Sequence, residues 1–175
     1  MTQEPVVIRA AAATDLPEVE ELLRSYMAEA LNRRWEGSLS ALERDGLGRE
    51  FHTLLAWRGR EAVGVAFWHR VYNVHFCVVG GEICDMFVKR HYRNSGTALM
   101  LVAAAARDIK SAGGSFLRGQ SDERLESLYS RCAVVVRGAE CYLGGNEFDA
   151  LAATSDISPR HMLRTLTFLS RDQRG

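Results

Sequence analysis

Hydrophobic residues recur along this chain with two different periods, and the changes of period predict its strands and helices. Residues 6–10 form a short run of β-formers. Apolar residues then recur at helical spacing from Val19 to Leu31, which predicts a long amphipathic helix with Thr14 as its N-cap. A second, short helix fits residues 39–44, because Gly46 follows it. The chain therefore begins with a strand and two helices.

The middle of the chain predicts at least three antiparallel strands. Residues 52–57 and 62–70 are rich in β-formers and flank a turn at 58–61 that contains Gly59. Further β-formers follow over residues 71–79, and we expect Gly80 and Gly81 to turn the chain into a strand over residues 81–88. In this strand, alternation places Ile83, Asp85 and Phe87 on one face, and it places Glu82, Cys84, Met86 and Val88 on the other.

A βαβ unit follows. Apolar residues at helical spacing predict a helix over residues 99–111, and Gly113 and Gly114 are a C-cap signal. Residues 115–119 predict a short strand after it. Because a strand, a helix and a strand come in this order, the strands at 81–88 and 115–119 should be parallel.

The last third of the chain predicts shorter elements. We expect a helix over residues 125–132, strands over 133–137 and 140–143, and a last short strand over 146–150. Residues 159–169 predict an amphipathic terminal helix. We therefore expect one domain over residues 1–155, followed by a C-terminal helix and polar tail over 156–175. That helix either docks on its own domain or forms a homodimer interface, and we favour the homodimer.

Composition excludes several classes of partner. The 175 residues carry 22 basic and 22 acidic side chains, so the formal net charge of zero favours neither nucleic acid nor a membrane surface. There is no apolar run long enough to span a bilayer and no N-terminal signal core, so we expect a cytoplasmic protein. The four cysteines lack the spacing of a metal site, and we expect no metal.

The turn between the strand at 81–88 and the next helix is suited to an anion. Arg90 and Arg93 bring positive charge, Asn94 or Ser95 can cap the helix, and Gly96 allows a ligand to approach the backbone closely. The first turn of the helix adds unpaired N–H groups and the positive end of its dipole. The turn therefore predicts a phosphate or pyrophosphate site, although both common nucleotide fingerprints are absent.

The order of the elements and two spaced motifs resemble the GNAT superfamily of acyl-CoA-dependent N-acetyltransferases. The segment from Glu82 to Met100, with Arg93-x-x-Gly96-x-Ala98 inside it, is similar to the coenzyme-binding motif of that family. Residues 125–131 resemble the family's helix that carries a tyrosine, here Tyr129, near the coenzyme thiol. Two departures stand out: Ala98 replaces the more usual glycine, and Cys132-Ala133 stands where many members have Gly-Phe.

The resemblance implies a fold and a set of binding residues. The fold would be α/β (α+β), with a mixed, mostly antiparallel central sheet of six to seven strands, flanking helices and a splayed coenzyme cleft. The backbone of Phe87 and Val88 would hydrogen-bond the pantetheine arm, which would lie beside them like an added strand. One of their N–H groups could polarise the thioester carbonyl. The pyrophosphate would be held by Arg93 and by the backbone N–H groups of Asn94, Ser95, Gly96, Thr97 and Ala98.

The resemblance also implies a reaction. Acetyl-CoA would be the acyl donor, and the acceptor would be a primary amine of a small molecule, peptide or protein. Tyr129 would protonate the leaving thiolate, because a hydroxyl with a pKa of about 10 suits that task. The candidates for the general base are Asp85, Glu82, Asp122 and Glu123. We favour Asp85 slightly over Glu82. With no histidine beside Cys84 in the sequence, we expect direct transfer rather than an acyl-enzyme. The alternative function is a non-catalytic module that binds acyl-CoA or another protein.

Overall fold

The computed structural model describes residues 4–120, 135–137 and 140–154. The described elements, in chain order, are β1 (Val6–Ala10), the 3-10 turn η1 (Ala13–Asp15), α1 (Leu16–Leu31), α2 (Leu39–Asp45), β2 (His52–Arg58), β3 (Glu61–Asn73), β4 (Val78–Val88), the 3-10 turn η2 (Arg90–Tyr92), α3 (Thr97–Ser111), β5 (Phe116–Gln120), β6 (Val135–Arg137), β7 (Glu140–Gly144) and α5 (Gly145–Ala153). They belong to two compact units. The first comprises Met1–Trp68 and Asp85–Leu101, and the second comprises His69–Cys84 and Val102–Gly175.

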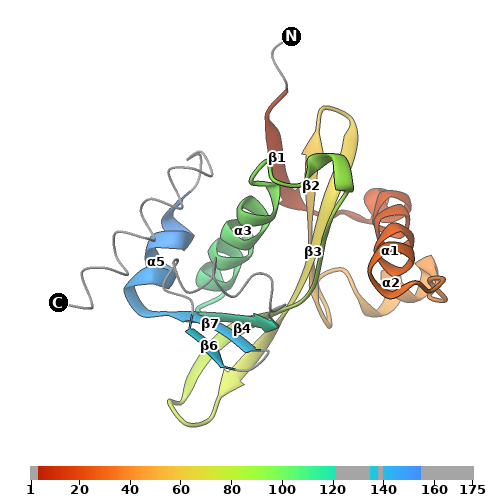
Figure 1. The fold of residues 1–175 in the computed structure, drawn as a ribbon. Helices are drawn as coiled ribbons and strands as arrows, with labels where there is room; N and C mark the ends of the chain where they lie inside the picture. The colour runs from red at the N-terminus through yellow and green to blue at the C-terminus, as the bar shows by residue number, and fades with distance from the viewer. Residues whose placement is uncertain (1–3, 121–134, 138–139, 155–175) are drawn as a thin grey trace. The chain divides into compact units, whose positions relative to one another are not determined.

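The first unit is built on the strand order β1-β2-β3-β4. β1 and β2 are antiparallel, with Ile8 opposite Ala56, and β2 and β3 are antiparallel, with Leu54 opposite Ala66. Helices α1 and α2 lie together on one side of β2 and β3 (Figure 1). The predicted strand, two helices and hairpin are therefore confirmed.

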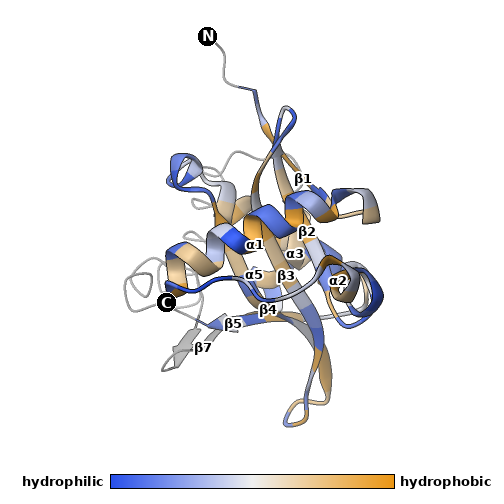
Figure 2. Ribbon diagram, turned by 90° about the vertical axis from the view of Figure 1, so that its right-hand side faces the viewer, coloured by the Kyte–Doolittle hydropathy of each residue, from blue (hydrophilic) through white to orange (hydrophobic). Residues whose placement is uncertain are grey.

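An apolar core holds α1 against these strands. Val19 and Leu22 of α1 are 1% and 0% exposed, and they share one cluster with Leu55, Val65 and Phe87. In Figure 2, α1 lies over β2 and β3, and polar and apolar positions alternate around its surface. Burial of apolar side chains at about 1.5–3 kcal/mol each is what fixes this helix on the sheet.

The second unit continues from β3 and β4 in the order β3-β4-β5-β7-β6. β5 is parallel to β4 over Gly81–Ile83, with Glu82 opposite Arg118, and β7 is antiparallel to both β5 and β6. The predicted parallel βαβ pair is therefore confirmed. With seven strands and one parallel pair, the sheet is mixed and mostly antiparallel, as expected.

The predicted turn at Gly80–Gly81 is wrong, because both glycines lie inside β4. The turn instead lies at residues 74–77, where the side-chain oxygen of Asn73 accepts hydrogen bonds from the N–H groups of His75 and Phe76. Gly80 has a packing role. A Cβ atom there would lie 2.5 Å from the ring of Phe116, so only glycine fits beside that ring.

Two further predictions are corrected. Residues 146–150 were expected to form a strand but lie in helix α5, whose buried Phe148, Leu151 and Ala152 follow helical spacing. Thr14 is not the cap of α1, which starts after Asp15. Asp15 accepts from the N–H of Ala12 and forms two hydrogen bonds with Arg9, so the acid ties the turn before α1 to β1 rather than capping the helix itself.

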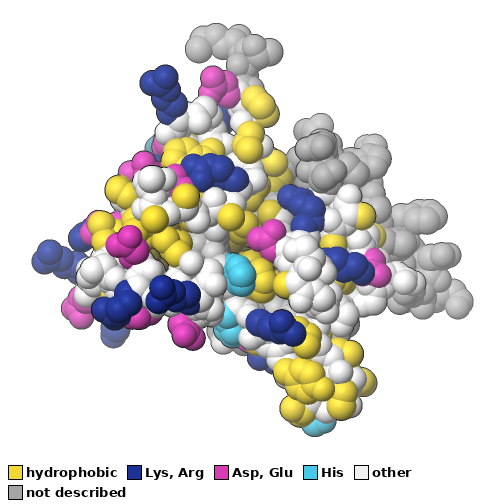
Figure 3. Space-filling model, turned by 180° about the vertical axis from the view of Figure 1, so that it is seen from behind, with side chains coloured by type: hydrophobic (Ala, Val, Ile, Leu, Met, Phe, Trp, Pro, Cys, Tyr) yellow, Lys and Arg dark blue, Asp and Glu magenta, His cyan; other side chains and the backbone are white. Residues whose placement is uncertain are grey.

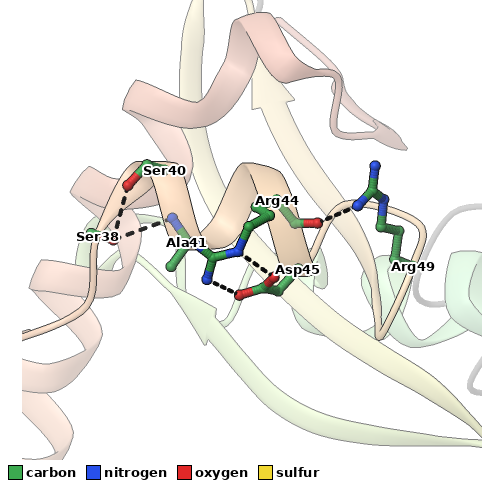
Figure 4. Close-up of polar contacts among 6 residues, drawn as sticks. All are labelled: Ser38, Ser40, Ala41, Arg44, Asp45 and Arg49. Atoms are coloured by element: carbon green, nitrogen blue, oxygen red, sulfur yellow. Dashed lines mark hydrogen bonds and ion pairs between the residues drawn. The ribbon is translucent and has the colours of Figure 1, made fainter.

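Helix α2 ends as predicted, at Gly46. The hydroxyl of Ser38 accepts from the N–H of Ala41 at its start, and Arg44 pairs with Asp45 in its last turn (Figure 4). Arg49 also donates to the carbonyl of Arg44. These side chains are solvent-exposed, so they define the ends of the helix rather than a binding site.

The β3–β4 hairpin carries exposed apolar side chains at its tip. Tyr72, Val74 and Phe76 are 55%, 69% and 74% exposed. Figure 3, which views the molecule from behind, shows apolar side chains gathered at the lower edge of the view. Among the described residues, no helix has the length and apolar content needed to cross a membrane. The predicted helices at 125–132 and 159–169, and the boundary at 155/156, fall outside the described residues.

Candidate active site

The turn predicted to bind phosphate has the backbone of an anion site. After β4 and η2, Asn94 has a φ of 59° and Gly96 a φ of 86°, and α3 starts at Thr97. Gly96, rather than Asn94 or Ser95, directly precedes the helix, and its carbonyl accepts the N–H of Met100. Positive φ at Gly96 requires glycine for conformational reasons alone. The backbone N–H groups of the first helical turn are left for a ligand.

Side-chain hydrogen bonds stabilise the conformation of this turn. The hydroxyl of Ser95 donates to the carbonyl of Tyr92 at 2.6 Å and lies 2.8 Å from the hydroxyl of Thr97, which is only 1% exposed. Asn94 and Ala98 are exposed. The turn is therefore fixed by its own hydroxyl groups, while its outer backbone stays accessible.

A charged network anchors η2 to β3. Tyr92 donates to Glu61, and Lys89 forms ion pairs with both Glu61 and Glu21. The Tyr92 hydroxyl and then the Lys89 ammonium hold the pKa of Glu61 below its ordinary value. Burial opposes the charge of Lys89, but its bonds to Glu21 and Glu61 outweigh it, so the pKa of Lys89 is raised. The network keeps both partners charged at neutral pH.

Arg93 is already paired in this structure. Its Nε donates to the carbonyl of Val88 at 2.8 Å, its guanidinium forms an ion pair with Glu29 of α1, and it lies 5.5 Å from the ring centroid of Phe87. Arg93 therefore fixes the end of β4, and any anion must compete with an exposed carboxylate for it. Phe87 and Val88 are 6% and 7% exposed, so a ligand would contact mainly their backbone atoms.

The two favoured carboxylates lie on opposite faces of β4, as alternation predicts. Asp85 accepts a 2.8 Å hydrogen bond from the hydroxyl of Tyr26, on the face covered by α1. Glu82 belongs to the second unit, where its Oε2 accepts a 2.7 Å hydrogen bond from Nε of Arg118 and forms an ion pair with its Nη2 at 2.7 Å. Each carboxylate is therefore held by a different kind of partner, Asp85 by a neutral hydroxyl and Glu82 by a guanidinium. Tyr129, Asp122 and Glu123 lie outside the described residues.

Sequence reasoning missed three partners of these residues: Tyr26, Glu29 and His69. Tyr26 and Glu29 lie on α1, far from β4 in the sequence, and nothing in their spacing indicates a contact with Asp85 or Arg93. The third partner, His69, lies on β3, and its Nδ1 lies 2.8 Å from the Sγ of Cys84. Cys84 therefore has a histidine beside it in space, although none lies beside it in the sequence. The absence of a nearby histidine in the sequence is thus no argument against a nucleophilic Cys84.

The loop after α1 forms a shallow basic hollow of about 370 Å³. It is lined by Arg24, Ala28, Asn32, Arg33, Arg34 and Trp35. Arg24 lies 5.5 Å from the ring centroid of Trp35, so part of the charge covers the indole. Among the described residues, no group of three or more His, Cys, Asp or Glu side chains is placed to hold a metal ion.

The Acetyltransferase (GNAT) family profile matches residues 16–133, about two thirds of the chain, and this protein belongs to that family. A search of curated proteins found no match. Several solved structures share the fold. Ribosomal-protein-alanine N-acetyltransferase from Brucella melitensis biovar Abortus 2308 has a TM-score of 0.64 and 22% identity, and the match covers 76% of this chain and 94% of that one.

Two other similar structures contain ligands. The aminoglycoside acetyltransferase meta-AAC0020 from an uncultured soil metagenomic sample, in complex with sisomicin, has a TM-score of 0.61, 18% identity and coverage of 70% of this chain and 82% of that one. The PaiA N-acetyltransferase from Thermoplasma acidophilum, in complex with coenzyme A, has a TM-score of 0.56, 15% identity and coverage of 79% and 96%. At these identities the likeness shows the fold and not the acceptor.

Proposed function

We propose that this protein is an acetyl-CoA-dependent N-acetyltransferase that acetylates a primary amine of a small molecule, peptide or protein by direct transfer. The observation that carries the proposal is the turn from Arg93 to Ala98, where positive φ at Gly96 opens the backbone at the N-terminus of α3. A pyrophosphate fits this turn, because its exposed N–H groups and the helix dipole favour an anion. Membership of the GNAT family supports the same assignment.

The pantetheine arm would lie along the end of β4. β4 pairs with β5 over Gly81–Ile83, so Phe87 and Val88 lie beyond this ladder. Their backbone can bond an extended arm in the manner of an added strand. The N–H of either residue would then stabilise the oxyanion of the tetrahedral intermediate. In this arrangement Arg93 holds the Val88 carbonyl in place and supplies charge near the phosphates.

Acetyl-CoA supplies an activated acetyl thioester. Asp85 would take the proton that makes the attacking amine nucleophilic, and the bond between nitrogen and the acetyl carbon forms as the carbonyl oxygen becomes an oxyanion. The intermediate then collapses, the bond between carbon and sulfur breaks, and Tyr129 would protonate the thiolate. The basic hollow at Arg24, Arg33 and Arg34 favours an acceptor that carries an anionic group besides its amine.

Release of coenzyme thiol in the presence of amines tests the proposal. The purified protein is incubated with acetyl-CoA and a panel of small amines, peptides and aminoglycosides, and free thiol is measured. We expect amine-dependent release with at least one acceptor class. Coenzyme binding without release for any amine would overturn the enzymatic function and favour a non-catalytic acyl-CoA-binding module.

The phosphate turn is tested by calorimetric titration of acetyl-CoA into a Gly96→Glu variant. We expect affinity to fall roughly tenfold or more, a loss of at least about 1.4 kcal/mol, because a carboxylate and a side chain enter the anion site. Gly113→Glu is the matched control, since Gly113 has a φ of 81° and ends α3 rather than starting it. Equal affinity in the wild type and the Gly96→Glu variant would remove the pyrophosphate from this turn.

A further inference from the structure

Three side chains form a polar chain around the thiol of Cys84 in the second unit. The Sγ of Cys84 lies 2.8 Å from Nδ1 of His69. The other ring nitrogen of His69 lies 4.0 Å from Oε2 of Glu82, which is beyond hydrogen-bond distance and at the outer limit of an ion pair with a protonated ring. Arg118 donates from its Nε to the same carboxylate oxygen at 2.7 Å, and its Nη2 forms an ion pair with that oxygen at 2.7 Å. Thiol, imidazole, carboxylate and guanidinium therefore follow one another in space.

The local strand geometry accounts for this cluster. Glu82 and Cys84 are two positions apart on β4, so their side chains share a face. His69 comes from β3, the hydrogen-bonded neighbour of β4, and Arg118 comes from β5, directly opposite Glu82. Three adjacent strands thus hold the four groups.

Solvent reaches the cluster. Cys84 is exposed, and the side chains of His69 and Arg118 are 38% and 37% exposed. The Sγ atom also lies 3.8 Å from the carbonyl of Glu82, so the thiol is held on the side of its partners. A small reagent can therefore approach the sulfur while the imidazole stays in contact with it.

The thiol, imidazole and carboxylate follow one another in the order that activates a nucleophile in enzymes. An imidazole within hydrogen-bond reach of a thiol can take its proton, and the thiolate is the reactive form of cysteine. A carboxylate on the far side of the ring orients the imidazole and stabilises its protonated form. Because Arg118 holds Glu82, that carboxylate stays in position.

We propose that Cys84 is a nucleophilic thiol, activated by His69 and Glu82, that accepts an acyl group from a thioester in a reaction separate from the direct transfer to the amine. In this step His69 takes the thiol proton and the sulfur of Cys84 bonds to the acyl carbon. The bond from that carbon to the donor sulfur breaks, and the leaving thiolate takes the proton back from His69. One thioester is consumed and one is formed, so no oxidant or reductant is needed. The identity of the electrophile rests on the proposed function, but the activation of Cys84 does not.

Cys77 is an internal control in the same unit. It is also exposed, and its Sγ donates to the carbonyl of Val74 at 3.7 Å, whereas that of Cys84 contacts an imidazole. Differences between the two thiols therefore report the surroundings of Cys84 and not general access of a reagent to the unit.

The first experiment measures alkylation by iodoacetamide at each cysteine with peptide mass mapping between pH 5 and 9. At neutral pH we expect Cys84 to react roughly tenfold faster than Cys77, because the paired imidazole increases the thiolate fraction. His69→Gln and Glu82→Gln should each slow Cys84 and leave the rate of Cys77 unchanged. If the two cysteines react equally in the wild type, or if neither variant slows Cys84, the activation is overturned.

The second experiment incubates the protein with acetyl-CoA in the absence of amine. We expect the peptide that contains Cys84 to gain the mass of one acetyl group, which hydroxylamine removes, and we expect no gain on that peptide in Cys84→Ser. Rapid alkylation of Cys84 without any acetylation would overturn the acyl-acceptor role. Amine-dependent thiol release is measured separately. Its absence would overturn the proposed function, whereas the iodoacetamide rates would stand.

Discussion

The hydroxyl of Tyr26 on α1 donates a 2.8 Å hydrogen bond to Oδ1 of Asp85 on β4, across 59 positions of sequence. Burial and then the bond to this carboxylate raise the pKa of Tyr26 to about 12. Tyr26 therefore remains a protonated donor throughout the neutral range. Its ring lies 6.0 Å from that of Phe87, two positions along the same face of β4. One tyrosine thus orients the favoured base and packs on a residue predicted to contact the coenzyme.

Replacement of Tyr26 by phenylalanine should destabilise the protein by about 1.5–3 kcal/mol, the usual value of a hydrogen bond to a charged group. The measurement is urea unfolding. The folded pKa of Tyr26 lies above its unfolded value of about 10, so the folded state holds the proton more tightly. The stability from this bond is complete below pH 10 and falls as the pH rises toward 12. Tyr26→Phe should lack that alkaline loss.

Tyr72→Phe is the matched control, because Tyr72 is 55% exposed on the hairpin. It should keep both the stability and the alkaline loss of the wild type. If Tyr26→Phe unfolds at the same urea concentration as the wild type, the bond to Asp85 contributes nothing to stability.

The choice between the two carboxylates can be tested by turnover. Asp85 accepts one hydrogen bond from a neutral hydroxyl, whereas Glu82 is hydrogen-bonded and ion-paired to a guanidinium, so Asp85 is the better placed to receive a proton. Asp85→Asn should lower kcat by a factor of about 10²–10⁴, the usual contribution of a general base. Glu82→Gln should lower it much less. The reverse order, measured by thiol release at saturating acetyl-CoA, would assign the base to Glu82.

The sequence allowed the fold to be predicted where the pattern was long and periodic. The helix from Val19 to Leu31 and the parallel pair around α3 were both correct, because burial of one face dictates the spacing. The pattern failed at short segments. Gly80 was interpreted as a turn residue, but it lies in β4 because it must clear the ring of Phe116, a contact with no local signal.

The candidate site could be predicted only as far as its own segment. The turn from Arg93 to Ala98 is contiguous, so its residue types indicate an anion site directly. The partners that decide what its residues can do come from elsewhere in the chain. Glu29 on α1 pairs with Arg93, and His69 on β3 contacts Cys84. Such pairings depend on how the strands and helices pack, and no spacing within one segment encodes them.

The pair between Arg93 and Glu29 predicts opposite effects of two substitutions on coenzyme affinity. Arg93→Gln should weaken acetyl-CoA binding by about 1.5–3 kcal/mol, the value of a charged hydrogen bond. Glu29→Gln should tighten it by up to about fivefold, because it removes a competing exposed ion pair worth roughly 0.2–1 kcal/mol. Calorimetric titration measures both. Glu20→Gln, which breaks the exposed pair with Arg24 on the same helix, should leave the affinity unchanged. Weaker binding in Glu29→Gln would mean that the pair itself organises the site.

A substitution can distinguish two roles of Tyr129: donation of a proton to the leaving thiolate, and packing alone. Tyr129→Phe keeps the ring and removes the hydroxyl, so it should lower kcat by a factor of about 10²–10⁴ and change the Kd for acetyl-CoA little. The measurement pairs thiol-release kinetics with titration. An unchanged kcat would remove Tyr129 from the mechanism, and a matched loss of binding would assign it to the coenzyme pocket instead.

The pair between Arg9 and Asp15 at the start of α1 gives the protein a specific sensitivity to acid. Asp15 is 6% exposed and accepts from two guanidinium nitrogens of Arg9, at 2.6 and 2.7 Å, and from the N–H of Ala12 at 2.8 Å. The Arg9 guanidinium and then the Ala12 N–H hold the pKa of Asp15 below its ordinary value, although burial opposes them. Asp15→Asn should therefore cost about 1–3 kcal/mol at pH 7, because the Arg9 guanidinium and the N–H of Ala12 lose a charged acceptor.

The pH dependence of this contribution has a definite sign. Because the folded pKa of Asp15 is lowered, its stabilisation is complete above the unfolded value near 3.8 and is lost as the pH falls through the folded value. Urea unfolding between pH 2 and 7 should show a smaller acid loss in Asp15→Asn than in the wild type. Asp45→Asn is the control, since Asp45 and Arg44 form an exposed pair (Figure 4), and it should unfold like the wild type at every pH. Equal acid profiles for Asp15→Asn and the wild type would mean that other carboxylates cause the acid unfolding.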